Sequence, residues 1–166
     1  VTIIAAGGSD AKLSQLESLY GVRHSINYNR LEGSFKDAVN GLTDGRGADV
    51  IFDPVGGELF QQCLRSIAWN GRILVVGFAA DGDNLPQART NLLLLKGSAL
   101  LGVFWGRFAG EEPEKNTANF RTMFQWHAEG RLAPHISHRF PLEEAIAALQ
   151  TLARREVVGK CVVTID

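Results

Sequence analysis

Residues 47–78, GADVIFDPVGGELFQQCLRSIAWNGRILVVGF, decide how this chain is expected to fold. Short runs of branched apolar residues at 50–52 and 72–77 are typical of strands that are buried on both faces of a parallel sheet. Between them, residues 58–69 predict a helix with one apolar face, and Asn70-Gly71 predicts its end because both residues tolerate left-handed backbone. The stretch therefore indicates one strand–helix–strand unit with a right-handed crossover.

The rest of the chain continues this alternation. Further strands are expected at 1–6, 25–28, 98–105 and 159–165, and further helices at 11–20, from 34, at 90–96, from 113 to 130 and from 141. Residues 81–89 and 106–113 are expected to be loops. The last two helices are expected to bury apolar faces made of Phe120, Met123, Phe124 and His127, and of Leu142, Ala145, Ile146, Leu149 and Leu152. The alternation predicts an α/β fold with a doubly wound parallel sheet.

Ligands of such sheets bind beyond the carboxyl ends of the strands, so residues 53–57 and 77–80 are expected to face a ligand. A complete dinucleotide-binding fold also begins with a strand and a G-x-G-x-x-G turn. Residues 1–9 offer only Gly7-Gly8. In the strand order 3-2-1-4-5-6 the missing strand would be central. Because a reading frame normally begins with Met, the start at Val1 leads us to expect a processed or truncated product.

Composition narrows the class of protein. The chain has 166 residues, of which 45% are hydrophobic and 21% charged, which suits one globular domain. A formal net charge of −1 gives no electrostatic reason to expect nucleic acid or an anionic membrane as a partner. The apolar runs at 91–95 and 99–105 are too short to span a membrane. Cys63 and Cys161 are too few for a disulfide framework, so we expect reduced core thiols and a cytoplasmic location.

Three strings, ADVIFDPVGG, GRILVVGF and NLLLLKGSALLGVFWG, resemble the cofactor-binding half of the zinc-independent quinone oxidoreductases of the medium-chain dehydrogenase/reductase family. The resemblance continues through GRLAPHIS, FPLEEAIAAL and VVGKCVVTI to residue 166. It implies an incomplete Rossmann-like domain over residues 1–133, lacking the first strand and the glycine-rich pyrophosphate loop. Residues 134–166 match a segment that packs with the substrate domain in that family.

The resemblance also implies where an NADPH cofactor binds. In the family, a glycine and a lysine four residues apart bind the 2′-phosphate, and Gly8 and Lys12 match them. A tyrosine that ends the next strand corresponds to Tyr28, and an arginine before the glycine of the final strand corresponds to Arg155. Two cations and a hydroxyl around a phosphate dianion are chemically sensible. Gly77 and Phe78 match the stretch that passes over the nicotinamide ribose, and Asn91 with Leu92 matches a segment near the nicotinamide.

Each of these positions also has a plainer interpretation. Lys12 alone is compatible with a solvated surface lysine, and Gly77 with a tight turn. Asp53 is expected to cap its own turn rather than to act in catalysis. Asp10 argues against the phosphorylated cofactor, because an acidic side chain in this region favours a free ribose 2′-hydroxyl.

No metal site is expected. His135 and His138 lie three residues apart on an extended segment, so their side chains point to opposite faces and do not easily share an ion. With no cluster of Cys or carboxylates nearby, we expect neither zinc binding nor a zinc-dependent fold. No spacing in the chain indicates a catalytic residue.

The resemblance implies that the parent enzyme is an NADPH-dependent reductase of quinones or related conjugated carbonyls that works by hydride transfer. It also implies a homodimer, because the family pairs the strand at 98–105 with its twin across a two-fold axis. The alternative is an inactive truncated fragment that acts only as a dimerising module.

Overall fold

A computed structural model describes residues 1–80 and 85–165. The chain divides into two compact units, Val1–Trp105 and Gly106–Asp166, each of which is described by itself. The functional boundary expected between residues 133 and 134 is a different division and stays a prediction.

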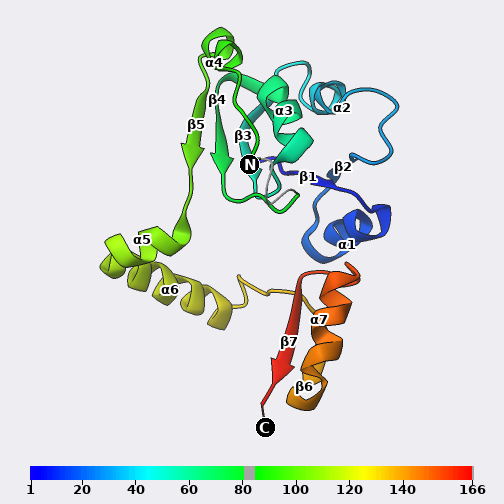
Figure 1. Ribbon diagram of the computed structural model, residues 1–166, viewed down its shortest axis with the longest axis vertical. Helices are drawn as coiled ribbons and strands as arrows, with labels where there is room; N and C mark the ends of the chain where they lie inside the picture. The colour runs from blue at the N-terminus through cyan, green and yellow to red at the C-terminus, as the bar shows by residue number, and fades with distance from the viewer. Residues whose placement is uncertain (81–84, 166) are drawn as a thin grey trace. The chain divides into compact units, whose positions relative to one another are not determined.

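The N-terminal unit alternates strands and helices, as predicted (Figure 1). Its elements are β1(Ile4–Gly7), α1(Asp10–Tyr20), β2(His24–Asn27), α2(Phe35–Gly41), β3(Ala48–Asp53), α3(Gly57–Ser66), β4(Ile67–Val75), α4(Thr90–Lys96) and β5(Ala99–Gly102). Every strand pairing described in this unit is parallel. The fold is therefore the expected Rossmann-like α/β arrangement.

The sheet of this unit falls into two parts. β1 pairs with β2, and β3, β4 and β5 form a three-stranded sheet in that order. Within the described residues, no ladder joins β1 to β3. The break lies where the strand order of a dinucleotide-binding fold places its first strand, between the two halves. The remaining strands therefore leave this position open instead of closing over it.

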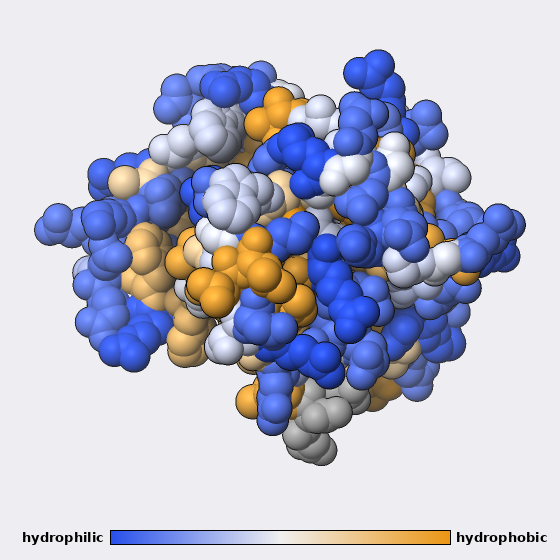
Figure 2. Space-filling view, turned by 90° about the horizontal axis from the view of Figure 1, so that it is seen from above, coloured by the Kyte–Doolittle hydropathy of each residue, from blue (hydrophilic) through white to orange (hydrophobic). Residues whose placement is uncertain are grey.

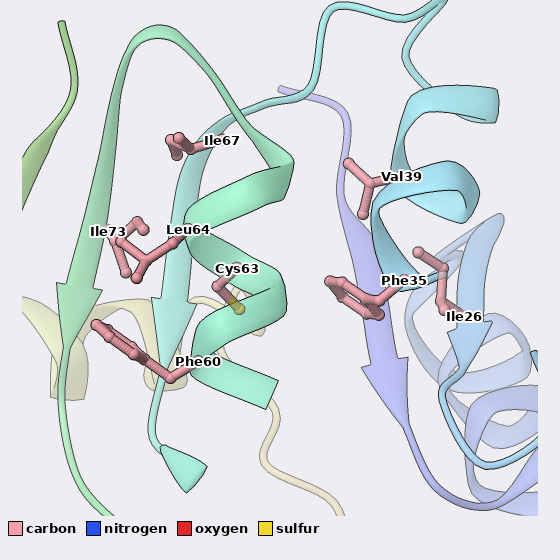
Figure 3. Close-up of a cluster of buried hydrophobic side chains, with 8 residues drawn as sticks. All are labelled: Ile26, Phe35, Val39, Phe60, Cys63, Leu64, Ile67 and Ile73. Carbon is pink, nitrogen blue, oxygen red and sulfur yellow. The ribbon is translucent and has the colours of Figure 1, made fainter. Parts of the chain in front are cut away.

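One buried cluster nevertheless belongs to both parts of the sheet (Figure 3). Its members come from β2, α2, α3 and the two ends of β4, and they are Ile26, Phe35, Val39, Phe60, Cys63, Leu64, Ile67 and Ile73. Side chains from β1 and β3, among them Ile4 and Ile51, pack against it. The apolar face predicted for α3 is thus buried. This shared core, rather than backbone hydrogen bonding, connects the two parts.

The helix predicted for residues 58–69 ends earlier than expected. α3 stops at Ser66, and β4 begins at Ile67, which pairs with Ala48 of β3. Ile67 and Ala68 are fully buried, so tertiary packing outweighs their place in a helical pattern. Asn70 does adopt left-handed backbone, with φ of 57°, but it lies inside β4 next to an irregularity in the β3–β4 register. The left-handed position was predicted correctly and its role was not.

The strand predicted at 98–105 is also shorter. β5 covers only Ala99–Gly102, and residues expected to form a loop form α5(Trp105–Glu111). Arg107 and Glu111 form an exposed ion pair at the i,i+4 spacing within this helix. β5 nevertheless lies at the edge of its three-stranded sheet, as expected.

The C-terminal unit is smaller. It contains α6(Pro113–Ala128), β6(Ile136–Pro141), a 3₁₀ turn η1(Leu142–Glu144), α7(Ala145–Ala153) and β7(Lys160–Thr164), with β6 and β7 parallel. Within the described parts of the chain, no helix is both long and apolar enough to span a membrane.

The apolar faces expected on α6 and α7 are largely exposed in this structure. Ile146 and Leu149 are 72% and 67% exposed, whereas α7 buries Ala148 and Thr151. A two-stranded sheet offers little surface, so it covers only the narrow, small-residue side of the helix. Exposed apolar residues are visible as orange patches among hydrophilic side chains in Figure 2.

Replacing Leu64 with Ala should lower the free energy of unfolding by about 3 kcal/mol, because Leu64 is 1% exposed in the shared core and its loss leaves a cavity. Leu94→Ala is the matched control, since Leu94 is 82% exposed, and it should cost less than about 0.5 kcal/mol. Urea unfolding followed by circular dichroism measures both. Equal losses would show that the cluster is not the core of this unit.

Candidate functional site

The carboxyl ends of the parallel strands bring together most of the residues predicted to bind a ligand. Gly7 lies in register with Asn27 at the ends of β1 and β2, and Asp53 with Val75 at the ends of β3 and β4. We call Gly8, Asp10, Lys12, Tyr28, Asn29 and Arg30 the β1–β2 cluster. We call residues 53–57 and 76–80 the β3–β4 loops.

Gly8 and Tyr28 lie against each other. A Cβ atom added at Gly8 would lie 2.7 Å from the Asn29 Nδ2 atom and 3.1 Å from the Tyr28 ring. The Asn29 side-chain amide donates to the Gly8 carbonyl over 3.1 Å, and the Tyr28 amide donates to the Gly7 carbonyl over 3.1 Å. Position 8 therefore requires glycine, because the side chains of Asn29 and Tyr28 already fill the space that a Cβ atom would take.

Lys12 lies in the first turn of α1, which begins directly after this glycine. The side chain of Ser9 caps the helix and accepts a hydrogen bond from the Lys12 amide over 3.4 Å. This cap fixes where the first turn starts, and with it the position of the Lys12 backbone relative to Gly8. Gly8, Lys12 and Tyr28 thus occupy the same end of the β1–β2 pair.

The charge of Asp10 is engaged within the cluster. One oxygen of its carboxylate accepts a hydrogen bond from Asn27 Nδ2, and the other forms an ion pair with Arg30. Arg30 and Asn29 were not among the predicted site residues. Their place directly after Tyr28 in the sequence is a signal that could have drawn attention to them, but it does not reveal their partners.

The β3–β4 loops are held together by backbone hydrogen bonds. The Val76 amide donates to the Asp53 carbonyl over 2.9 Å, and the Ala79 amide donates to the Pro54 carbonyl over 3.1 Å. A Cβ atom added at Gly77 would lie 3.3 Å from the Pro54 carbonyl oxygen. The backbone at Gly77 therefore passes close to the loop after β3. This close contact is sufficient to explain why a glycine stands at position 77.

Phe78 follows Gly77 and lies over Gly56. A Cβ atom at Gly56 would be 3.1 Å from the Phe78 ring, and Gly56 has a φ of 71°. This position therefore requires glycine for both its conformation and its contact. Asn91 and Leu92 lie in the first turn of α4, where Asn91 is exposed and Leu92 half-buried.

Asp53 caps its own turn, as predicted. Its side chain is buried, and its Oδ1 atom accepts hydrogen bonds from the amides of Val55 over 2.9 Å and of Gly56 over 3.0 Å. A carboxylate that is occupied by two backbone donors stabilises the turn and has no evident role as an acid or base.

Cys63 lies below these loops in the core and is not a nucleophile. Burial, and to a smaller extent the charge of Asp53, raises the pKa of the Cys63 thiol to about 12. The group therefore stays protonated at neutral pH, and the prediction of an inert core thiol is confirmed for Cys63. Cys161 is free and half-buried.

The histidines of the C-terminal unit have partners of other kinds. His138 contacts the Ser137 hydroxyl at 2.8 Å and stacks on Phe140, while the Nδ1 atom of His127 lies 2.8 Å from the Leu132 carbonyl oxygen. Across residues 1–80 and 85–165, no three His, Cys, Asp or Glu side chains gather in a group that could hold a metal ion.

Arg155 lies in the C-terminal unit, in left-handed backbone just after α7. Its φ is 59°, and its amide donates to the Leu152 carbonyl over 3.0 Å. It is thus not part of the unit that carries Gly8, Lys12 and Tyr28, and its contribution to cofactor binding stays a prediction.

The β1–β2 cluster contains donors of the types that bind anionic groups. Tyr28 carries a hydroxyl against Gly8, Lys12 lies in the first turn of α1, and Arg30 pairs with Asp10. Charged donors of this kind suit a phosphate better than a neutral hydroxyl.

Comparisons with known proteins agree with the fold. A family model described as zinc-binding dehydrogenase matches residues 20–163. The chain is 40% identical over 163 residues to quinone oxidoreductase-like protein 2 of Bos taurus, which covers 98% of this chain and 45% of that protein.

Two solved structures extend the comparison. An NAD-dependent alcohol dehydrogenase is 27% identical with a TM-score of 0.78, over 98% of this chain and 43% of that one. A quinone oxidoreductase of Pseudomonas syringae has a TM-score of 0.79 at 22% identity, over 98% of this chain and 48% of that one, which supports the fold alone.

The chain spans about half the length of the curated relatives it matches. The part that it matches is the half that carries the cofactor-binding fold described above. The chain therefore belongs to the zinc-binding dehydrogenase family, within the medium-chain dehydrogenases/reductases, and its relatives are of the quinone oxidoreductase-like type.

Proposed function

We propose that this chain is the cofactor-binding part of an NADPH-dependent oxidoreductase that reduces quinones or related conjugated carbonyls. The observation that carries the proposal is the β1–β2 cluster, where Gly8, the Tyr28 ring and the first turn of α1, which holds Lys12, lie at the same end of the β1–β2 strand pair. The relatives support an oxidoreductase, and their names include both quinone oxidoreductase-like proteins and an NAD-dependent dehydrogenase. The choice of NADPH therefore depends on the residues of the cluster.

In this function the nicotinamide, when bound, supplies the hydride, and the protein binds and orients. Lys12 and the Tyr28 hydroxyl would hold the 2′-phosphate, and a contribution from Arg155 of the C-terminal unit stays a prediction from the resemblance. Gly77 and Phe78 lie along the nicotinamide ribose, where the absence of a side chain at 77 permits close approach and the Phe78 ring excludes water. We assign no catalytic acid or base to this chain, and we expect cofactor binding to need no zinc.

A second candidate function is that of an interaction module without activity of its own. It is favoured by the open edge of β5, whose unpaired backbone groups can pair with another chain. The two free cysteines, one of them a buried thiol, fit a reducing compartment, and we propose a cytoplasmic location.

Turnover separates these two candidates. NADPH oxidation by the chain in the presence of a simple quinone is followed by absorbance, with cofactor binding measured in parallel. We expect binding without turnover, because we assign no catalytic acid or base to this chain. Measurable turnover would contradict the inactive-module alternative, and a failure to bind either cofactor would contradict the proposed function.

Lys12→Ala should remove most of the preference for NADPH over NADH. A charged hydrogen bond contributes about 1.5–3 kcal/mol, so the affinity for NADPH should fall about tenfold or more while that for NADH changes little. Lys36→Ala is the control, because Lys36 is an exposed lysine on α2 of the same unit. Titration calorimetry with both cofactors measures the difference. Equal titration curves for NADPH and NADH with the unmutated chain would refute the assignment.

We also propose a homodimer that forms through β5. The strand lies at the edge of its sheet, and the segment from 99 to 105 exposes Leu101, Val103, Phe104 and Trp105. Residues 98–105 contain no Lys, Pro or Asp of the kind that blunts an open edge. Symmetric pairing of two such edges would bury these side chains from both copies.

Leu101→Pro should shift the chain toward monomer, because proline removes a ladder donor from the centre of β5. Light scattering at micromolar concentration should give twice the 18.1 kDa chain mass for the unmutated protein and for a Leu101→Val control. A mass near 18.1 kDa for the unmutated protein would show that this edge is not an interface.

A further inference from the structure

The turn that follows β2 delivers several side chains to one place. The Arg30 amide donates to the Asn27 carbonyl over 3.1 Å, and the Asn29 amide donates to the Asn27 side-chain oxygen over 3.0 Å. These bonds fix the turn over residues 27–30. As a result Tyr28 and Asn29 reach Gly8, while Asn27 and Arg30 reach Asp10.

Asp10 is the residue that should oppose a phosphorylated cofactor. It begins α1, two residues after Gly8. An acidic side chain in this region accepts a hydrogen bond from a ribose 2′-hydroxyl and repels a 2′-phosphate. Without Arg30, the negative charge of Asp10 would offset the positive charge of Lys12, and the cluster would carry no net charge.

The contacts of Asp10 change this balance. Asn27 donates to one carboxylate oxygen and Arg30 pairs with the other, so the acceptor atoms that would meet a ribose hydroxyl are engaged inside the protein. With Arg30 included, the cluster contains two cationic side chains, Lys12 and Arg30, and one anionic side chain, Asp10, so its net charge is positive. A dianion meets an attractive field rather than a neutral one.

We propose that Arg30 is a specificity-determining residue, which makes the cluster accept a 2′-phosphate by holding the Asp10 carboxylate and by adding a second cation. This inference rests on the proposed NADPH-dependent function and deepens it. Arginine suits the double role, because its guanidinium carries five N–H donors and the pairing with Asp10 uses one terminal nitrogen.

The geometry leaves the pair accessible to a ligand. The side chains of Arg30 and Asp10 are 76% and 51% exposed. An ion pair this exposed adds little to stability, so variants at either position are expected to fold. An ion pair that affects ligand binding differs from a purely structural surface pair in its effect on the preference for a 2′-phosphate.

The test compares 2′,5′-ADP with 5′-AMP, which differ by the 2′-phosphate alone and need no pyrophosphate loop. Amide chemical shifts in the ¹⁵N-labelled chain give both dissociation constants, and their ratio is the phosphate preference. Because the ratio is internal to each variant, small losses of stability cancel. Circular dichroism checks that each variant is folded.

Arg30→Ala should lower this preference about tenfold, because it removes a charged donor and frees the carboxylate of Asp10. Arg30→Lys keeps the charge and should retain most of the preference. Asp10→Asn should raise it, and Asp10→Asn combined with Arg30→Ala should recover part of the loss. Arg46→Ala is the matched control, since Arg46 forms a comparable exposed ion pair with Asp49 away from the cluster, and it should leave the ratio unchanged.

The failures are distinguishable. If the unmutated chain prefers 2′,5′-ADP and Arg30→Ala keeps that preference, Arg30 is a surface residue and only this inference is overturned. If the unmutated chain binds both ligands equally, or neither, the proposed NADPH function is contradicted and this inference with it. A loss with Arg30→Ala that Asp10→Asn does not offset would overturn the part assigned to Asp10.

Discussion

The packing of α2 and α3 into one buried cluster is the interaction on which the N-terminal unit depends. Phe35 and Val39 come from the part of the chain that carries β1 and β2, and Phe60 and Leu64 come from the part that carries β3 to β5. Within the described residues no strand ladder links these two parts, and the apolar contacts of this cluster are the packing that joins them. The hydrophobic effect is not directional, and it therefore tolerates the break in the sheet.

This arrangement also explains why the site has two regions. Each sheet presents its own carboxyl edge, and each edge is closed by a turn that is stabilised locally. Asn27 holds the turn after β2, and Asp53 holds the turn after β3 through two backbone amides. Both regions can therefore form from short-range interactions.

Much of the fold followed from local pattern. The alternation of elements and the turn of Asp53 depend on neighbours in sequence, and these predictions were confirmed. The end of α3 was predicted wrongly because Ile67 fits either a helix face or a buried strand, and only its pairing with Ala48 decides between them. The faces of α6 and α7 were predicted from apolarity alone, which cannot indicate how much surface the small β6–β7 sheet offers.

The same limit applies to the candidate site. Gly8 with Tyr28 was found because the family spacing marks both, and the structure places them in contact. The pairing of Asp10 with Arg30 was missed, although both residues are plain in the sequence, because a contact between positions 20 apart depends on the register of β1 with β2. The prediction treated Asp10 as an isolated charge, whereas its effect on a bound phosphate depends on the side chains that pair with it.

The break between β1 and β3 has a consequence for local unfolding. The unit β1–α1–β2 can separate from β3–β5 without breaking a described ladder hydrogen bond, so side-chain contacts such as those of Ile26 set the free energy of that opening. Regions of this kind form cooperative units whose amides exchange with solvent ahead of global unfolding. The β1–β2 cluster lies on the β1–α1–β2 part. A ligand bound there would stabilise the closed state by mass action and would slow the exchange of the backbone amides of this part with solvent.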